Sequence, residues 1–76
     1  MNAYDAVFVK VLGLEQDDLA NNPTFADTPQ WDSLCHMELV AALEDAFDIM
    51  LEPEEITHFE SYENGKKILA AHDALI

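Results

Sequence analysis

The sequence predicts an all-α fold: a small bundle of three main helices and one short helix, with a long loop between the first two helices. Three segments carry apolar residues at helical spacing, their ends carry capping residues, and no β-hairpin signal or internal repeat interrupts them. A chain of 76 residues has room for one hydrophobic core. We therefore expect a single domain over residues 1–76.

The first helix is expected to begin at Asn2, whose side chain can cap free backbone amides, and to end at Gly13. Its buried face follows the i, i+3, i+4 spacing and consists of Tyr4, Val7, Phe8, Val11 and Leu12. Residues 14–31 show no sustained period and contain several Asn and Pro, so a long loop is predicted there. Its apolar anchors are expected to be Leu14, Leu19, Phe25 and Trp31.

The second helix is predicted from Ser33 to Phe47, with Asp32 as its N-cap. At 100° per residue the expected core face is His36, Leu39, Val40, Leu43 and Phe47. The opposite face is expected to present Leu34, Glu38, Ala41 and Asp45, flanked by Met37, Glu44 and Asp48. This is an apolar strip ringed by carboxylates, with Ser33 beside it, and such an arrangement is typical of a docking surface.

A short helix is predicted from Pro53 to His58, because proline suits the first helical position. The last helix should begin after Ser61 as its cap and run close to the C-terminus. Its inward stripe is expected to be Tyr62, Gly65, Ile68, Leu69, His72 and Ile76. A glycine on that stripe indicates a close approach of another group to the backbone.

Charge restricts the classes of partner. Sixteen Asp and Glu face three Lys, for a net charge of −13. Such a surface repels nucleic acid and anionic membranes and favours a basic protein surface. No apolar run reaches about 18 residues and no signal peptide is visible, so a cytoplasmic protein without membrane insertion is expected. We also expect a monomer.

The sequence does not predict an enzyme or a metal site. Asp32, Ser33 and His36 are the residue types of a hydrolase triad, but no Gly-x-Ser-x-Gly motif surrounds the serine and His36 falls on the core face. Cys35 is the only cysteine, and neither zinc-ligand nor EF-hand spacing occurs. Acidic neighbours oppose activation of the Cys35 thiol, which is expected to be unreactive. Ser33 is thus expected to be a fixed, exposed hydroxyl that another protein modifies.

The order of motifs resembles the acyl carrier protein family. The resemblance rests on Trp31-Asp32-Ser33-Leu34, on the acidic helix over residues 37–48, and on the pattern of Leu51, Glu54, Glu55, Ile56, Phe59 and Ser61. It implies a four-helix carrier in which Ser33, between Asp32 and Leu34, bears covalent 4′-phosphopantetheine. The thiol of that arm would hold acyl groups as thioesters.

The resemblance also implies partners. A phosphopantetheinyl transferase would attach the arm, and acyl-activating, acyltransferase or synthase enzymes with basic patches would dock on the second helix. The implied docking residues are Leu34, Met37, Glu38, Ala41, Glu44, Asp45 and Asp48. Family members can shelter cargo among their helices, and Val40, Leu43, Ile56 and Phe59 are the expected lining here.

Three departures from the family pattern leave the pathway open among fatty acid, polyketide and specialised acyl-transfer metabolism. Trp31 replaces a small residue, Cys35 replaces an acid, and Met50 stands where an acid is common. Two alternatives remain at this point. One is an aminoacyl or peptidyl carrier with the same arm, and the other is an unmodified acidic helical adaptor that binds a basic partner.

Overall fold

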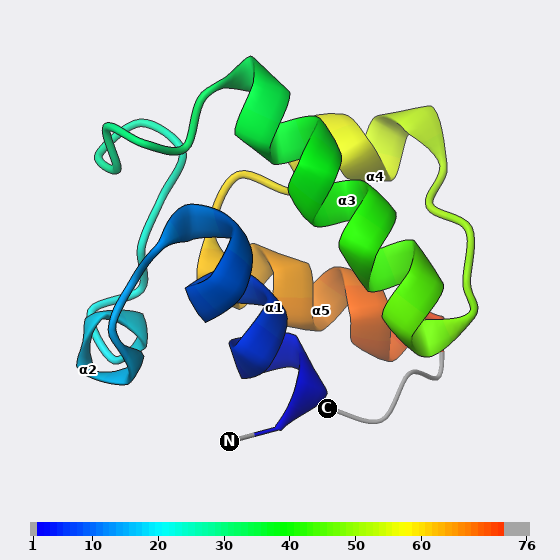
Figure 1. Cartoon of the computed structure of the whole chain (residues 1–76). Helices are drawn as coiled ribbons and strands as arrows, with labels where there is room; N and C mark the ends of the chain where they lie inside the picture. The colour runs from blue at the N-terminus through cyan, green and yellow to red at the C-terminus, as the bar shows by residue number, and fades with distance from the viewer. Residues whose placement is uncertain (1, 73–76) are drawn as a thin grey trace.

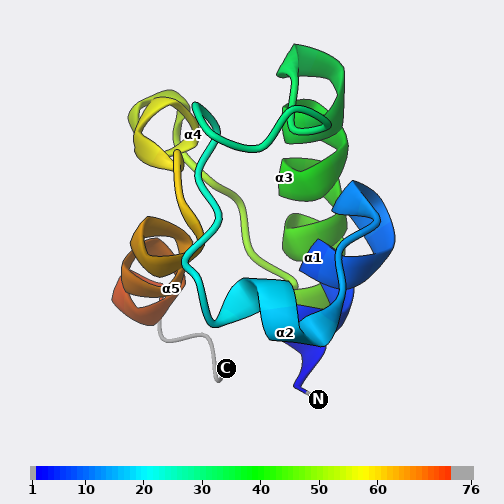
Figure 2. The same cartoon turned by 90° about the vertical axis from the view of Figure 1, so that its left-hand side faces the viewer.

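The computed structural model describes residues 2–72, and over this part of the chain the fold is all-α, as predicted (Figure 1). The helices are α1 (Ala3–Leu12), α2 (Gln16–Leu19), α3 (Ser33–Phe47), α4 (Pro53–His58) and α5 (Tyr62–Ala71). Figure 2 shows α1 and α3 along one side of the molecule and α4 and α5 along the other. Every helix within residues 2–72 is too short or too polar to cross a bilayer.

The predicted helix ends are confirmed by their capping hydrogen bonds. Each N-cap side chain accepts a hydrogen bond from the backbone N–H three residues on, at 2.8 Å for Asn2, 2.9 Å for Asp32 and 3.0 Å for Ser61. Gly13 ends α1 in the left-handed region at φ 66°. Pro53 is the first residue of α4, as expected.

The predicted count of one short helix is wrong, because the segment 14–31 contains the additional one-turn helix α2. Glu15 and Asp18 form a reciprocal capping box, in which the Glu15 N–H donates to Asp18 Oδ2 at 2.9 Å. Four residues are too few to show a helical period, so only the pair of acids three residues apart signalled this turn in the sequence. The turn buries Leu19, one of the four expected anchors.

The other three expected anchors differ in how deeply their side chains are buried. Trp31 is 1% exposed, whereas Leu14 is half-buried and Phe25 is 38% exposed. The Phe25 ring nevertheless packs edge-on against Trp31 and His36. The chain around Phe25 is held against the residues just before α5, because the Phe25 N–H donates to the Glu60 carbonyl at 2.8 Å. The Tyr62 N–H donates in turn to the carbonyl of residue 23 at 2.9 Å, beside an antiparallel bridge between residues 24 and 61.

The core lies between the two sides of the bundle and is built largely from aromatic rings. Its largest fully buried side chains are Trp31, Tyr4, Phe8, Phe59, Leu39, Leu43 and Leu69. Phe8 of α1 is central, since its ring lies against those of four other aromatic residues. Burial of these side chains is the main source of stability for so short a chain.

The expected inward stripe of α5 is confirmed at Tyr62, Gly65 and Leu69, which are buried, while Ile68 is half-buried. The backbone of Gly65 lies against the Tyr4 hydroxyl and the Phe59 ring, so the close approach that the glycine indicated is present. Ile76, the last residue of the expected stripe, lies outside the described residues.

Candidate functional site

Ser33 is the first residue of α3, and its side chain is exposed. Asp32 fixes the start of the helix, because its carboxylate accepts the Cys35 N–H. On the other side of the motif, Trp31 is buried and its backbone N–H donates to the Thr28 carbonyl at 2.9 Å. The serine is therefore held between a buried anchor and a capped helix while its hydroxyl faces solvent.

His36 is fully engaged by hydrogen bonds. Its Nδ1 accepts from Trp31 Nε1 at 3.1 Å, and its Nε2 lies 2.9 Å from the Ile56 carbonyl oxygen. Because an indole N–H only donates and a carbonyl only accepts, these partners assign a neutral imidazole with its proton on Nε2. Neither ring nitrogen is free to take the Ser33 proton. His36 is half-buried on the inward side of α3, in agreement with its expected place on the core face.

Cys35 follows the motif and is half-buried. Burial raises the pKa of its thiol, and the neighbouring carboxylates of Asp32 and Glu38 raise the pKa further. The direction of the shift agrees with the unreactive thiol expected from the sequence.

We expect Cys35 to be alkylated by iodoacetamide at pH 7.5 more slowly than the same thiol in the protein unfolded in guanidinium chloride. The raised pKa leaves a smaller thiolate fraction at this pH, and the thiolate is the reactive form. Glu38→Gln should speed alkylation of the folded protein, because it removes one of the charges that oppose the thiolate. The measurement is the rate of mass gain. Faster alkylation of the folded form would contradict the prediction.

Six of the seven expected docking residues are exposed on α3 or at its end: Leu34, Met37, Glu38, Ala41, Asp45 and Asp48. Leu34 is 70% and Met37 is 54% exposed, which is unusual for large apolar side chains. With Ala41 they form a strip along one helix face, and acidic residues border it. We call these six residues the docking face.

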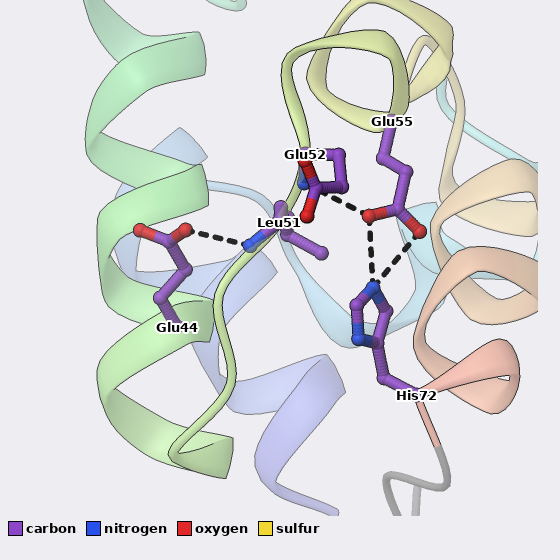
Figure 3. A network of polar contacts seen from close by, with 5 residues as sticks. All are labelled: Glu44, Leu51, Glu52, Glu55 and His72. Atoms are coloured by element: carbon purple, nitrogen blue, oxygen red, sulfur yellow. Dashed lines mark hydrogen bonds and ion pairs between the residues drawn. The ribbon is translucent and has the colours of Figure 1, made fainter.

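Glu44 differs from the other six, since it is half-buried. Its Oε2 accepts the Leu51 N–H at 2.8 Å (Figure 3). The chain turns back after Asp48, which adopts the left-handed region at φ 52°, and this brings Leu51 beside α3. Glu44 therefore holds the connection between α3 and α4 against α3 through this hydrogen bond. A helical wheel of α3 alone does not predict the contact.

A hollow of about 260 Å³ lies between α3 and α4. Its lining consists of Phe25, His36, Ile56, Thr57, Phe59 and Glu60. Of the residues expected to shelter cargo, Ile56 and Phe59 lie here, whereas Val40 and Leu43 belong to the buried core. Sequence reasoning missed Phe25 and His36 as lining, because only the packed loop brings Phe25 across to α3. A larger hollow of about 440 Å³ adjoins Phe25 between residues 22–27 and the start of α5.

The chemistry of the site is that of a positioned, exposed hydroxyl next to an acidic helix face with an apolar strip. Asp32, Ser33 and Leu34 share the start of this helix, with Asp32 engaged as the cap. Within residues 2–72, no group of three or more His, Cys, Asp or Glu side chains is placed to hold a metal ion. A comparison of the chain with models of known protein families finds no match.

Proposed function

We propose that this chain is a carrier protein of the acyl carrier type, with the fold of that family, and that Ser33 carries 4′-phosphopantetheine. The observation that carries the proposal is the exposed Ser33 hydroxyl at the first position of α3, with the nearby His36 fully occupied by other partners. A hydroxyl held in this way needs a base from another protein. A transferase supplies one, so the carrier itself needs no catalytic machinery.

In the proposed modification, the Ser33 oxygen attacks the β-phosphate of coenzyme A within a phosphopantetheinyl transferase. A phosphodiester forms at Ser33, 3′,5′-ADP leaves, and the serine proton passes to a base of the transferase. The start of α3 favours the product, because the first backbone N–H groups and the helix dipole stabilise a nearby phosphate. Asp32 opposes part of this effect by its charge, but its carboxylate is engaged by the Cys35 N–H.

The arm held by Ser33 would supply a thiol that could carry cargo as a thioester to partner active sites. Tethering keeps the cargo at a high effective concentration near each docked enzyme. On the docking face, Leu34, Met37 and Ala41 supply apolar contact, and the surrounding carboxylates attract basic patches. The net charge of −13 speeds such encounters at long range.

The cargo is an acyl group in this proposal, and an amino acid is the alternative within the same class. The two are distinguished by which activating enzyme loads the pantetheinylated protein. An acidic adaptor that binds a basic partner without modification is the alternative from another class, since the same docking face would serve it.

The deciding experiment is intact mass spectrometry after incubation with coenzyme A and a broad-specificity phosphopantetheinyl transferase. The wild type should gain the mass of one arm and Ser33→Ala none. Thr57→Ala is the matched control, because it removes an exposed hydroxyl from α4 and should still be modified. Circular dichroism should show that both variants are folded. A folded wild type that gains no mass contradicts the carrier proposal and supports the unmodified adaptor.

A further inference from the structure

Two side chains that flank the cap of α3 are joined across the start of the helix. Asp32 is the N-cap, so Trp31 is the residue before the cap and His36 is the fourth residue of the helix. Apolar side chains at these two positions often pack together and fix the angle at which the chain enters a helix. Here the two rings lie 6.1 Å apart at an interplanar angle of 28°, and Trp31 Nε1 donates to His36 Nδ1 at 3.1 Å.

A hydrogen bond to α4 holds the His36 ring in the tautomer that this contact needs. Its Nε2 lies 2.9 Å from the Ile56 carbonyl oxygen, which can only accept, so the ring proton is on Nε2. Nδ1 then presents a lone pair to the indole N–H. The result is one chain of hydrogen bonds from Trp31 through His36 to Ile56, which links the end of the loop, α3 and α4.

The Trp31 end of this chain is fixed by the core. The indole is 1% exposed, and its ring lies edge-on to those of Phe8 and Phe59. The Trp31 backbone N–H also donates to the Thr28 carbonyl at 2.9 Å. The half-buried His36 ring packs on Phe59 as well. The hydrogen bond between the two rings therefore ties the first turn of α3 to a part of the molecule that does not move easily.

The first turn of α3 has one restraint fewer than those of the two short helices. In a capping box, the side chain at the third helical position accepts the N–H of the cap residue. Asp18 does so in α2 and Glu55 does so in α4. In α3 this position is Cys35, and a thiol is a weak acceptor. The contact between Trp31 and His36 therefore supplies a restraint at the place where the box is incomplete.

We propose that Trp31 and His36 are positioning residues for Ser33, because their hydrogen bond sets the direction in which the first turn of α3 presents the Ser33 hydroxyl. Ser33 lies inside the segment that this bond closes, two residues after Trp31 and three before His36, and its side chain is exposed. The restraint is a property of the unmodified chain. Its consequence for reactivity rests on the proposed function, in which a transferase modifies this hydroxyl. Small displacements of a reacting atom lower the rate of a bound reaction strongly.

The test follows pantetheinylation of the full chain in single turnovers, with the transferase in excess at increasing concentration, so that product release does not limit the rate. Trp31→Phe keeps a ring in the core but removes the indole N–H. It should lower the maximal rate about three- to tenfold and change the half-saturating transferase concentration less than about twofold. This split is expected because the docking face is intact and only the reacting hydroxyl is displaced. An unchanged maximal rate overturns the proposal.

Three further variants separate positioning from general destabilisation. His36→Gln is the rescue variant, because its amide offers an acceptor to the indole and a donor to the Ile56 carbonyl, and it should react faster than Trp31→Phe. His36→Leu offers neither and should be as slow as Trp31→Phe. Tyr4→Phe is the matched control, since it also removes the donor of a buried hydrogen bond, the one to the Tyr62 carbonyl. Equal slowing by Tyr4→Phe would assign the effect to lost stability and contradict the positioning role.

Amide hydrogen exchange keeps this proposal distinguishable from the proposed function. The N–H groups of Cys35 and His36 donate to the carboxylate and the carbonyl of Asp32, at 2.9 and 2.8 Å. In Trp31→Phe these two amides should lose about two- to tenfold protection beyond any change at Leu43 in the middle of α3. A wild type that is never pantetheinylated contradicts the proposed function, and the exchange then decides the restraint alone. Unchanged relative protection of the Cys35 and His36 amides overturns the restraint, whatever the transferase does.

Discussion

Replacing Phe8 with alanine is expected to lower the free energy of unfolding by about 3–5 kcal/mol, the range for truncating a buried aromatic side chain to alanine. Phe8 is fully buried, and its ring centroid lies 5.2 to 5.7 Å from those of Tyr62 and Trp31, both in edge-on contact. Its loss leaves a cavity that α1 and α5 cannot close without moving other rings. A chain of this length has a total stability of about 4–11 kcal/mol, so the variant loses at least about a quarter of it.

Urea denaturation measures this effect, and Phe25→Ala is its matched control. Phe25 is the same residue type, but it is 38% exposed and packs only at the edge of the aromatic cluster. Its substitution should cost clearly less than that of Phe8. Equal shifts of the two denaturation midpoints would contradict the assignment of Phe8 as the centre of the core.

Replacing Gly65 with alanine is expected to destabilise the protein by about 1–3 kcal/mol, although alanine is the better helix former. In an exposed helix interior the same change is stabilising by about 0.5–1 kcal/mol. A Cβ at Gly65 would collide with both the Tyr4 hydroxyl and the Phe59 Cζ, and it would lie 2.8 Å from the Phe59 Cε1. The hydroxyl cannot move freely, because it donates to the Tyr62 carbonyl at 2.6 Å in a buried position. Breaking that bond leaves an unsatisfied buried group.

The collision itself is tested by a double-mutant cycle with Tyr4→Phe, which removes the oxygen that the new methyl group meets. Gly65→Ala should cost less in the Tyr4→Phe background than in the wild type. Chemical denaturation of the four proteins gives the coupling energy. An unchanged cost would place the strain at Phe59 instead, and a stabilising Gly65→Ala would contradict the close approach altogether.

The sequence was sufficient for features that depend on local chemistry. The caps at Asn2, Asp32 and Ser61 and the left-handed Gly13 each follow from what one side chain or its absence allows, and all four lie where they were predicted. The core face of α3 was also predictable, since a helical period assigns faces without knowledge of the partner. The exposed position of Ser33 follows from the Asp32 cap, which places Ser33 first in α3, and from the helical period, which places it away from the core face.

Features that depend on tertiary contacts were not predictable in the same way. Glu44 lies on the outward side of a helical wheel, yet the returning chain brings the Leu51 N–H to its carboxylate. The indole of Trp31 meets His36 five residues later, a spacing that neither a helix nor a strand pairs by itself. Such contacts arise where the chain changes direction, and sequence periodicity carries no information about the path that it then takes.

The bridge between Thr24 and Ser61 has a kinetic consequence. It joins residues 37 positions apart (61 − 24) and encloses α3 and α4 in one loop of the chain. Closing a flexible loop of this length costs about 3 kcal/mol of chain entropy, against few hydrogen bonds gained. We therefore expect this tie to form late in folding and to open early, before the capped helices melt. Brief openings of this kind would release the Phe25 segment from α5 while Asp32 still caps α3. The start of α3 at Ser33 would therefore stay helical while the loop that precedes it is detached.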